Sequence, residues 1–343
     1  MLAGVLSKLT ANQDLTFDEA YQVITAINDD KLSDVQIAGF QVALLMKGPN
    51  ITEITAIAQA MRDNCIPLSP RVDGELLDTC GTGGGLSTFN ISTAVALVAA
   101  AAGIPVAKHG SRSISSLSGS ADVLEALGVE INLSPRAVEK LIEEIGIAFI
   151  YAPLFHPVMH KVLPPEQALG IKTIFYTIIG PLINPARASR HLLGVYKPEL
   201  LDTVAQIALS LGYTRGLFVH GLDGLDEISL LGKTSVREIR DGAITSYEIA
   251  PEDFGLTRCR LEDIATGTPQ VNAGVIRDVF SGRNRGPRRQ AVVLNAAGAL
   301  LIGGKADSLA EGIKLAGEII DSGAAQHKLS QLAEASQDLV SVA

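Results

Sequence analysis

The sequence is short of charge, and that shortage excludes two classes of protein. Charged residues make up 19% of the 343 residues and leave a net charge of −9. A general nucleic-acid binder or membrane-surface binder needs an excess of lysine and arginine, which this chain does not have. Apolar residues reach 47%, so the chain can bury a large core and is not a disordered polymer.

Cysteine and long apolar runs are also scarce. The three cysteines, Cys65, Cys80 and Cys259, are odd in number and widely spaced, which favours reduced thiols over a disulfide framework. The longest apolar stretch, Ala94–Ala102, is far below the roughly 20 residues that a bilayer requires. The first residues lack the basic and apolar segments of a signal peptide. We therefore expect a cytoplasmic protein without a membrane partner.

Two kinds of patterning divide the chain. Residues 1–70 show apolar spacings of three and four, which predict a helical N-terminal domain that part of 160–190 joins. Residues 71–343 alternate short apolar runs with helical stretches, which predicts an α/β domain with a mostly parallel central sheet. Thr16 with Glu19 has the spacing of a capping box, and Ser33 and Thr52 are the helix caps that we expect next.

Glycine is abundant: the 33 glycines are close to one residue in ten, against a usual share of about 7%. Several of them lie directly after one predicted strand. The segment Asp78–Thr93 runs from that strand through four glycines to Asn90 and an apolar helix. Glycines allow backbone N–H groups to approach an anion, and the helix N-terminus adds its dipole. The spacing matches neither the dinucleotide nor the Walker motif, so a tight strand–helix turn is the structural alternative.

A second loop strengthens the case for phosphate binding. Lys108–Ser120 places two cations, a histidine and six serines directly after a predicted strand. Hydroxyl, amide and cationic donors of this kind suit phosphate oxygens. A serine-rich linker is the alternative, but an apolar helix resumes at Ala121. Phosphate binding is therefore a better interpretation of the two loops together than a turn and a linker.

An acidic pair follows another predicted strand, which ends at His220. Asp226 and Glu227 are adjacent, and Mg²⁺ is typically held by one or two carboxylates, with water and substrate phosphates completing its shell. An acidic turn alone is usually only solvated. Beside two phosphate loops, the pair indicates the metal site of a diphosphate substrate.

These segments together resemble the anthranilate phosphoribosyltransferase family, which transfers phosphoribose from phosphoribosyl pyrophosphate (PRPP) to anthranilate in tryptophan biosynthesis. The resemblance runs essentially end to end. It is carried by Asn90–Thr93, Lys108–Gly110, Ser118–Asp122, His156–Pro157, Gly180–Leu182, Asn184–Pro185, Leu225–Glu227 and Asn295–Ala297. It implies a nucleoside-phosphorylase-like phosphoribosyltransferase fold, a cleft between the domains and a homodimer formed through the helical domain.

The resemblance also implies roles for individual residues. Two Mg²⁺ ions would be held by Ser92, Asp226 and Glu227. Lys108 and His109 are the catalytic candidates, with His109 either handling a proton or orienting its loop, and His156 structural. The acceptor, a small aromatic amine, would meet Gly81, Ser111 and Glu166. PRPP would meet Gly81, Gly84, Thr88, Asn90, Ile91, Ser92, Thr93, Lys108, Gly110, Ser111, Arg112, Ser113, Ser115, Ser116 and Ser120.

The sequence departs from the family pattern mainly on the acceptor side. Gly85 stands where the family carries an aspartate, in a glycine loop one residue shorter. Ser111 replaces an asparagine, Leu117 a common lysine, and Glu166 the arginine that meets the anthranilate carboxylate. An arginine-to-glutamate change replaces a bidentate carboxylate partner by a like charge. These departures predict an altered or weakened acceptor specificity.

Two other functions remain open from the sequence. A non-catalytic nucleic-acid-binding relative would need a basic groove, for which Arg283–Arg289, with four arginines in seven residues, is the one local patch. A phosphorolytic enzyme of the same fold is the other alternative. The pair Asp226–Glu227 disfavours it, because a phosphate co-substrate needs no metal clamp.

Overall fold

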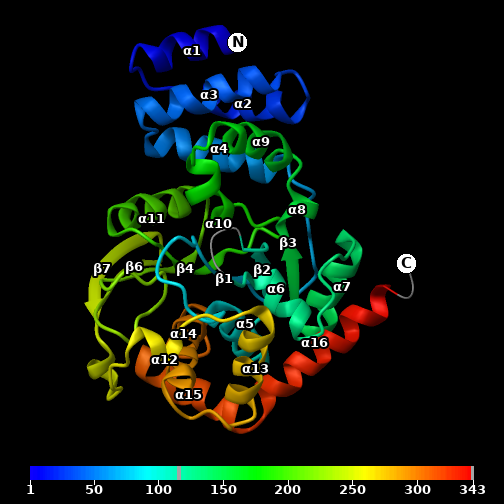
Figure 1. Cartoon of the computed structure of the whole chain (residues 1–343), viewed down its shortest axis with the longest axis vertical. Helices are drawn as coiled ribbons and strands as arrows, with labels where there is room; N and C mark the ends of the chain where they lie inside the picture. The colour runs from blue at the N-terminus through cyan, green and yellow to red at the C-terminus, as the bar shows by residue number, and fades with distance from the viewer. Residues whose placement is uncertain (114–116, 341–343) are drawn as a thin grey trace.

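The computed structural model describes residues 1–113 and 117–340, and it contains a helical part beside a larger α/β part (Figure 1). Ser115 and Ser116 therefore lie outside the described residues. The chain begins with four helices: α1 (Leu2–Thr10), α2 (Phe17–Asn28), α3 (Asp34–Lys47) and α4 (Ile51–Asp63). Within the described residues, no helix has both the length and the apolar character needed to span a membrane.

The helix starts follow local capping chemistry. Thr16 and Glu19 form the predicted capping box, in which Glu19 N donates to Thr16 Oγ1 at 3.2 Å and Thr16 N to Glu19 Oε2 at 2.9 Å. Ser33 caps α3 as predicted. The prediction of Thr52 as a cap is wrong, because Asn50 caps α4 and accepts from Glu53 N at 2.9 Å. The Asn50 side-chain oxygen accepts from that N–H, so the cap lies two residues earlier than predicted.

The α/β part is built on a seven-stranded sheet in the order β3-β2-β1-β4-β5-β6-β7. The first five strands in that order are parallel to one another. Strand β6 runs antiparallel to β5, and β7 runs antiparallel to β6. This confirms the predicted mostly parallel sheet. The strands are β1 (Leu77–Gly81), β2 (Val106–Gly110), β3 (Ile147–Tyr151), β4 (Arg190–Gly194), β5 (Arg215–Gly221), β6 (Thr234–Arg240) and β7 (Ala243–Ile249).

The order of the strands reverses beside β1, which lies between β2 and β4. Gly81 at the end of β1 pairs with Gly194 at the end of β4. In open parallel sheets, ligands bind outside the carboxyl ends of the strands at such a reversal. The fold therefore places the glycine loop after β1 at the expected binding edge, and β3 points toward the helical part (Figure 1).

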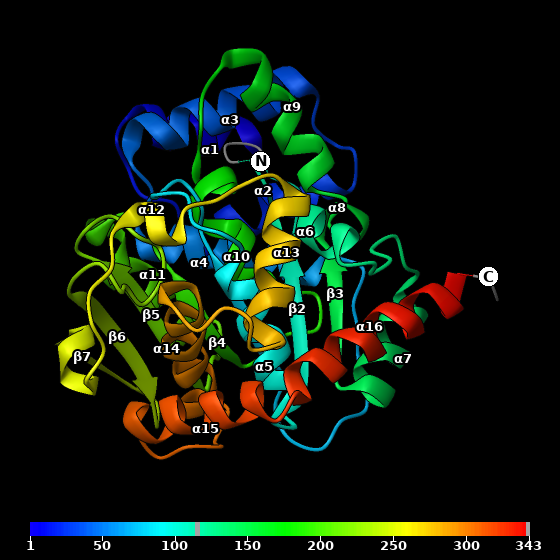
Figure 2. The same ribbon diagram turned by 60° about the horizontal axis from the view of Figure 1, so that its bottom comes forward.

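Helices cover both faces of the sheet. On the face away from the helical part, α5 and α14 contact the strands, and α13, α15 and α16 pack on these helices (Figure 2). The remaining helices connect strands or lie toward the helical part. The elements of both groups are α5 (Ile91–Ala101), α6 (Ser120–Ala126), α7 (Pro135–Ile145), α8 (Ala152–Phe155), α9 (Met159–Leu169), η1 (Phe175–Ile179), α10 (Gly180–Leu182), η2 (Pro198–Leu200), α11 (Leu201–Ser210), η3 (Pro251–Phe254), α12 (Leu261–Ile264), α13 (Pro269–Phe280), α14 (Pro287–Ile302), α15 (Leu309–Asp321) and α16 (Ala324–Val340).

A second apolar core lies between the sheet and the first four helices. Val158, Val162 and Phe175 lie in this core with residues of α1–α4, α11, β4 and β5. The chain thus returns to the helical part through α9 and η1 after forming β3. This return brings residues about 120 positions apart together, as in the hydrogen bond from Gln41 Nε2 to Val162 O at 2.8 Å.

The helices α14 and α15 pack closely through a glycine. A Cβ at Gly312 would lie 2.8 Å from Ala297 O and 2.9 Å from Ala297 Cα. Gly317, on the same helix, would meet only the Arg289 side chain, at 3.6 Å. The two positions therefore differ in packing but share a helical backbone.

We predict that Gly312→Ala lowers the free energy of unfolding by about 1–3 kcal/mol, because α15 must move off the α14 backbone. Gly317→Ala is the matched control, and alanine in an open helical position should leave stability unchanged or raise it by up to about 1 kcal/mol. Urea denaturation followed by circular dichroism measures both. Equal effects at the two positions would contradict close helix packing as the cause.

Candidate functional site

The carboxylate of Asp226 lies over the glycines at the strand reversal. Gly83 N donates to Asp226 Oδ2 at 3.0 Å. A Cβ at Gly81 would overlap this carboxylate, and one at Gly194 would overlap the Asp226 backbone carbonyl. A Cβ at Gly85 would lie 2.7 Å from Gly224 O. Glycine is therefore required here by the close approach of the acidic turn.

The acidic pair also contacts the N-terminus of α5 and a buried lysine. The Ser92 backbone donates to the Glu227 carboxylate, and Lys108 Nζ lies 3.4 Å from Ser92 Oγ and also donates to Thr79 O. Lys108 stands on β2, whereas Glu227 follows β5. Elements far apart in sequence thus bring a cation, a hydroxyl and two carboxylates together, as the sequence predicts for a phosphate and metal site.

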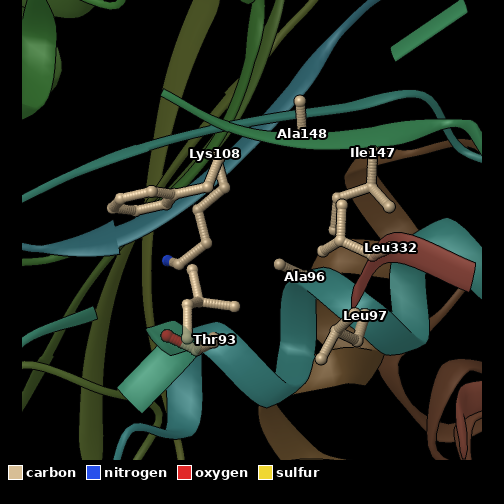
Figure 3. A pocket seen from close by; sticks show the side chains of 9 residues that line it. Thr93, Ala96, Leu97, Lys108, Ile147, Ala148 and Leu332 are labelled. Carbon is tan, nitrogen blue, oxygen red and sulfur yellow. The ribbon is translucent and has the colours of Figure 1, made fainter. Parts of the chain in front are cut away.

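The stem of Lys108 lies along an apolar wall, and Figure 3 shows its ammonium nitrogen beyond a small cavity. Ala96, Leu97, Leu332 and the Thr93 side chain line this cavity. Long cationic side chains commonly bury the stem while the head reaches a polar site. The cavity lies behind the lysine and is apolar, so it supports the side chain and holds no polar ligand.

Burial and mutual repulsion disfavour charge on the acidic pair. Loss of hydration and the neighbouring Asp226 raise the pKa of Glu227 to about 8. Loss of hydration also raises the pKa of Asp226 and lowers that of Lys108. Lys108 is the cation that acts on Glu227, so two carboxylates share the site with one lysine. Such an excess of hard oxygen ligands suits a divalent cation.

Asp122 fastens the two ends of the serine-rich loop. Asp122 Oδ2 accepts from Ser113 N at 3.1 Å and from Gly119 N at 2.8 Å. Arg112 pairs with Asp122 at 3.0 Å and with Glu125, so its guanidinium is turned to α6 rather than left free. The loop therefore enters and leaves at one anchored point beside the N-terminus of α6.

Ser111, Ser120 and Gly110 form the adjoining turn. Ser120 Oγ donates to Ser111 O at 3.3 Å. A Cβ at Gly110 would overlap the Ser120 hydroxyl and approach Phe149. The backbone at Gly110 must therefore pass close to α6, which brings the end of β2 to the serine loop.

Asn90 joins the glycine loop to the serine loop. Its Oδ1 accepts from Ser118 Oγ at 3.1 Å and from Asn272 Nδ2 at 2.9 Å, while its Nδ2 donates to Ser118 O at 3.1 Å. Asn272 was missed by the sequence reasoning. A lone asparagine within the apolar helix α13 is the available signal, and it is fully buried. Thr88 lies beside this junction, bridged to Ala265.

A buried polar network supports the end of β2. Asp78 Oδ1 accepts from His109 N at 3.1 Å, and Asp78 Oδ2 accepts from Asn184 Nδ2 at 2.8 Å. His109 Nε2 lies 3.0 Å from His156 Nε2, and its ring also bonds to the Gly180 backbone. Both rings are buried, so their geometry is suited to orienting the strand that carries Lys108.

Other predicted residues take peripheral or separate positions. Ile91 is buried in the α/β core, and Gly84, with φ +87°, packs on the Tyr196 ring. Glu166 lies on α9 in the helical part, hydrogen-bonded to Gln41 and Thr173. Within the described residues, none of the hydrogen bonds of Glu166 reaches the Lys108 cluster.

Two of the four arginines in the arginine-rich run pair with acidic side chains. Arg283 binds Asp278 at 2.6 Å and Arg289 binds Asp321 at 2.9 Å. Arg288 Nε donates to Asp263 O at 3.2 Å. These partners leave the run a poor phosphate-binding surface, which disfavours the nucleic-acid alternative.

Comparison with known proteins identifies both parts of the chain. Residues 3–65 match a family described as "Glycosyl transferase family, helical bundle domain". Residues 73–326 match one described as "Glycosyl transferase family, a/b domain". The chain is 47% identical to the anthranilate phosphoribosyltransferase of Acetivibrio thermocellus over 99% of its own length and 98% of that protein. It is 48% identical to that of Desulfosudis oleivorans, covering 97% and 98%.

Solved structures agree with these matches. Anthranilate phosphoribosyltransferase from Thermus thermophilus is 42% identical, with a TM-score of 0.90 over 97% of this chain and 99% of that one. The Saccharomyces cerevisiae enzyme in complex with PRPP and Mg is 28% identical, with a TM-score of 0.88 over 98% of both chains. The predicted fold class is confirmed by both comparisons.

The buried histidines of the site predict how stability depends on pH. Burial lowers the pKa of His109 to about 4 and that of His191 to about 3, and it also lowers that of His156. Below about pH 6.5 the unfolded chain binds these protons and the folded chain does not, so these three histidines make stability fall on acidification. Burial raises the pKa of Asp78 to about 6, that of Glu227 to about 8 and that of Asp226, and these carboxyls act in the opposite direction because the folded chain keeps protons that the unfolded chain releases.

We predict that His191→Gln makes the loss of unfolding free energy between pH 6 and pH 4.5 shallower by about 1.4 kcal/mol per pH unit, because one titrating group is removed. Urea denaturation at several pH values measures the slope. The exposed His327→Gln is the control and should leave the slope unchanged. An unchanged slope in His191→Gln would contradict a neutral, buried imidazole.

Proposed function

Because the chain belongs to the anthranilate phosphoribosyltransferase family of glycosyltransferases, we propose that it transfers the phosphoribosyl group of PRPP to the nitrogen of a small aromatic amine, with Mg²⁺. The observation that carries the proposal is the convergence of the glycine loop, Ser92, Lys108, Asp226 and Glu227 at the strand reversal. The similarity to an enzyme solved with PRPP and Mg supports it.

The residues present fit two magnesium ions. Asp226 and Glu227 are adjacent, partly exposed and short of cationic partners, and Ser92 adds a hydroxyl oxygen. Oxygen donors of this kind are the ligands that Mg²⁺ takes in phosphate sites. When bound there, Mg²⁺ would neutralise charge on the departing pyrophosphate. We propose these three residues as its ligands.

In this proposal, catalysis depends on the orientation of the two substrates and on electrostatic stabilisation of the leaving group. The glycine loop and the N-terminus of α5 lie at the strand reversal, where Lys108 adds a positive charge. They would hold the pyrophosphate while its bond to the ribose C1′ breaks and the acceptor nitrogen forms the new bond. The described PRPP-binding candidates in the two loops, residues 81–93, 108–113 and 118–120, lie at the ends of β1 and β2.

The acceptor would approach from the side of the helical part. Gly81 and Ser111 stand at the ends of β1 and β2, and Glu166 stands on α9. We propose His109 as the residue that orients Lys108, because its ring is buried against His156. Anthranilate itself is a doubtful acceptor, since Ser111 offers no amide and Glu166 opposes a carboxylate.

We predict that Glu227→Gln and Asp226→Asn lower kcat/KM for PRPP by about 10²-fold or more, because the leaving group loses its metal-dependent stabilisation. Chelation of Mg²⁺ should abolish turnover of the unmodified protein. Pyrophosphate release measures both. Lys233→Gln, an exposed change near the same strand, is the control. Full pyrophosphate release in the presence of chelator would contradict metal-dependent stabilisation of the leaving group.

We also propose a homodimer that forms through the helical part. Val35 and Met46 on α3 are 82% and 80% exposed, and a groove between α1 and α3 is lined by Leu9, Val42 and Met46. Large exposed apolar side chains gathered on one face are typical of a protein–protein contact. The same face lies away from the sheet, so a partner there leaves the strand reversal open.

We predict that Met46→Glu converts the dimer to a monomer, because it buries an unpaired charge in the contact. Light scattering after size-exclusion chromatography measures the mass. Val271→Glu, at a 53% exposed position on α13, is the control and should remain dimeric. A monomeric unmodified protein would contradict the proposed assembly.

A further inference from the structure

A carboxylate is buried in the helical part without a cationic partner. Glu166 on α9 is 2% exposed and meets Gln41 on α3 and Thr173 before η1. Within the described residues, Glu166 forms no ion pair. Apolar residues of the second core, including Phe40, Val162 and Phe175, surround this segment of the chain. A buried, unpaired carboxylate is costly and is a frequent mark of a binding site.

The hydrogen bonds leave one side of this cluster without donors. Thr173 Oγ1 accepts from Phe175 N at 3.3 Å and donates to Glu166 Oε1. Gln41 Nε2 donates to the same Oε1 at 3.2 Å and to Val162 O at 2.8 Å. Both side-chain donors therefore go to one oxygen of Glu166, and the Thr173 backbone also donates to this carboxylate, while Glu166 Oε2 meets no donor at hydrogen-bond distance.

The amide of Gln41 has only one workable orientation. Its nitrogen must face Val162 O, because a carbonyl oxygen there would oppose another acceptor. Gln41 Oε1 is consequently buried without a partner as well. Two acceptor atoms, Glu166 Oε2 and Gln41 Oε1, are thus left in one small cluster with no donor.

The chemistry of this pair selects the ligand. Two acceptors are satisfied by a group with two N–H donors, such as a primary carboxamide, an amidine or an ammonium. A carboxylate would place two further acceptors against them and repel the ionised Glu166. Burial raises the pKa of Glu166, and a donor supplied by a ligand would favour its ionised form.

The chain on each side of this cluster leads to the buried polar network that supports the end of β2. Helix α9 begins at Met159, three residues after His156, whose ring contacts His109. Seven residues of helix separate Met159 from Glu166, which is about 10 Å. Thr173 leads through η1 and α10 to Asn184, which bonds Asp78 and Ala107 O.

We propose that Gln41 and Glu166 form a subsite for an N–H donor substituent of the acceptor, so that the preferred acceptor is an aromatic amine carrying a carboxamide-type group instead of a carboxylate. The proposal rests on the proposed transfer from PRPP and specifies its acceptor class. Glu166 is here a specificity residue, because it meets the substituent and not the reacting nitrogen.

The test compares 2-aminobenzamide with anthranilate as acceptors for the full-length protein with PRPP and Mg²⁺. We expect kcat/KM for the amide to exceed that for anthranilate by about tenfold or more, the effect of one lost hydrogen bond to a charged group. Glu166→Gln keeps the shape and removes the charge, so this preference should fall by a similar factor. Glu144→Gln, exposed on α7, is the matched control and should keep it.

The outcomes separate this proposal from the one on which it rests. An equal or higher kcat/KM for anthranilate in the unmodified protein would overturn the subsite and leave phosphoribosyl transfer standing. Retention of the amide preference in Glu166→Gln would also overturn it. Calorimetry of Mg²⁺-dependent PRPP binding completes the design. PRPP binding without turnover of either acceptor overturns the subsite, and loss of PRPP binding overturns the proposed function together with it.

Discussion

The approach of Asp226 to three glycines is the constraint on which the binding edge depends. Its carboxylate accepts from Gly83 N, and neither Gly81 nor Gly194 has room there for a Cβ. This contact fixes the acidic turn over the strand reversal. Glu227 is then held against the Ser92 backbone, beside the ammonium of Lys108. Carboxylates, hydroxyl and cation meet because backbone approaches backbone, which only glycine permits.

Local chemistry explains what the sequence could predict. The capping box of Thr16 and Glu19, the glycine loop before α5 and the mostly parallel sheet all follow from spacing within a few residues. The prediction failed where two local signals competed, as at Thr52, where Asn50 is the cap. The two loops and the acidic pair were predicted to form one site, and in the structure each follows the end of a parallel strand, β1, β2 or β5.

Long-range partners could not be predicted from spacing. Asn272 reaches Asn90 across 182 residues, and Asn184 reaches Asp78 across 106. Each is one polar residue in an apolar surrounding, a signal that identifies a buried hydrogen bond but not its partner. At Arg112, the local sequence pattern did not predict the partners seen in the structure. Its sequence neighbours suggested a phosphate ligand, but Asp122 and Glu125 on α6 pair with it.

The strand reversal and the cluster of Gln41 and Glu166 depend on different interactions, so the cluster can change while the strand reversal does not. Close backbone packing at glycines shapes the strand reversal, so substitutions there disturb the backbone itself. Side chains of α3 and α9 form the cluster in the helical part, where Gln41 and Glu166 meet. A side-chain change in that second cluster alters which groups are hydrogen-bonded while the Asp226 contact stays intact. Under the proposed function, such a change would alter the choice of acceptor and leave the phosphate end of the site as it is.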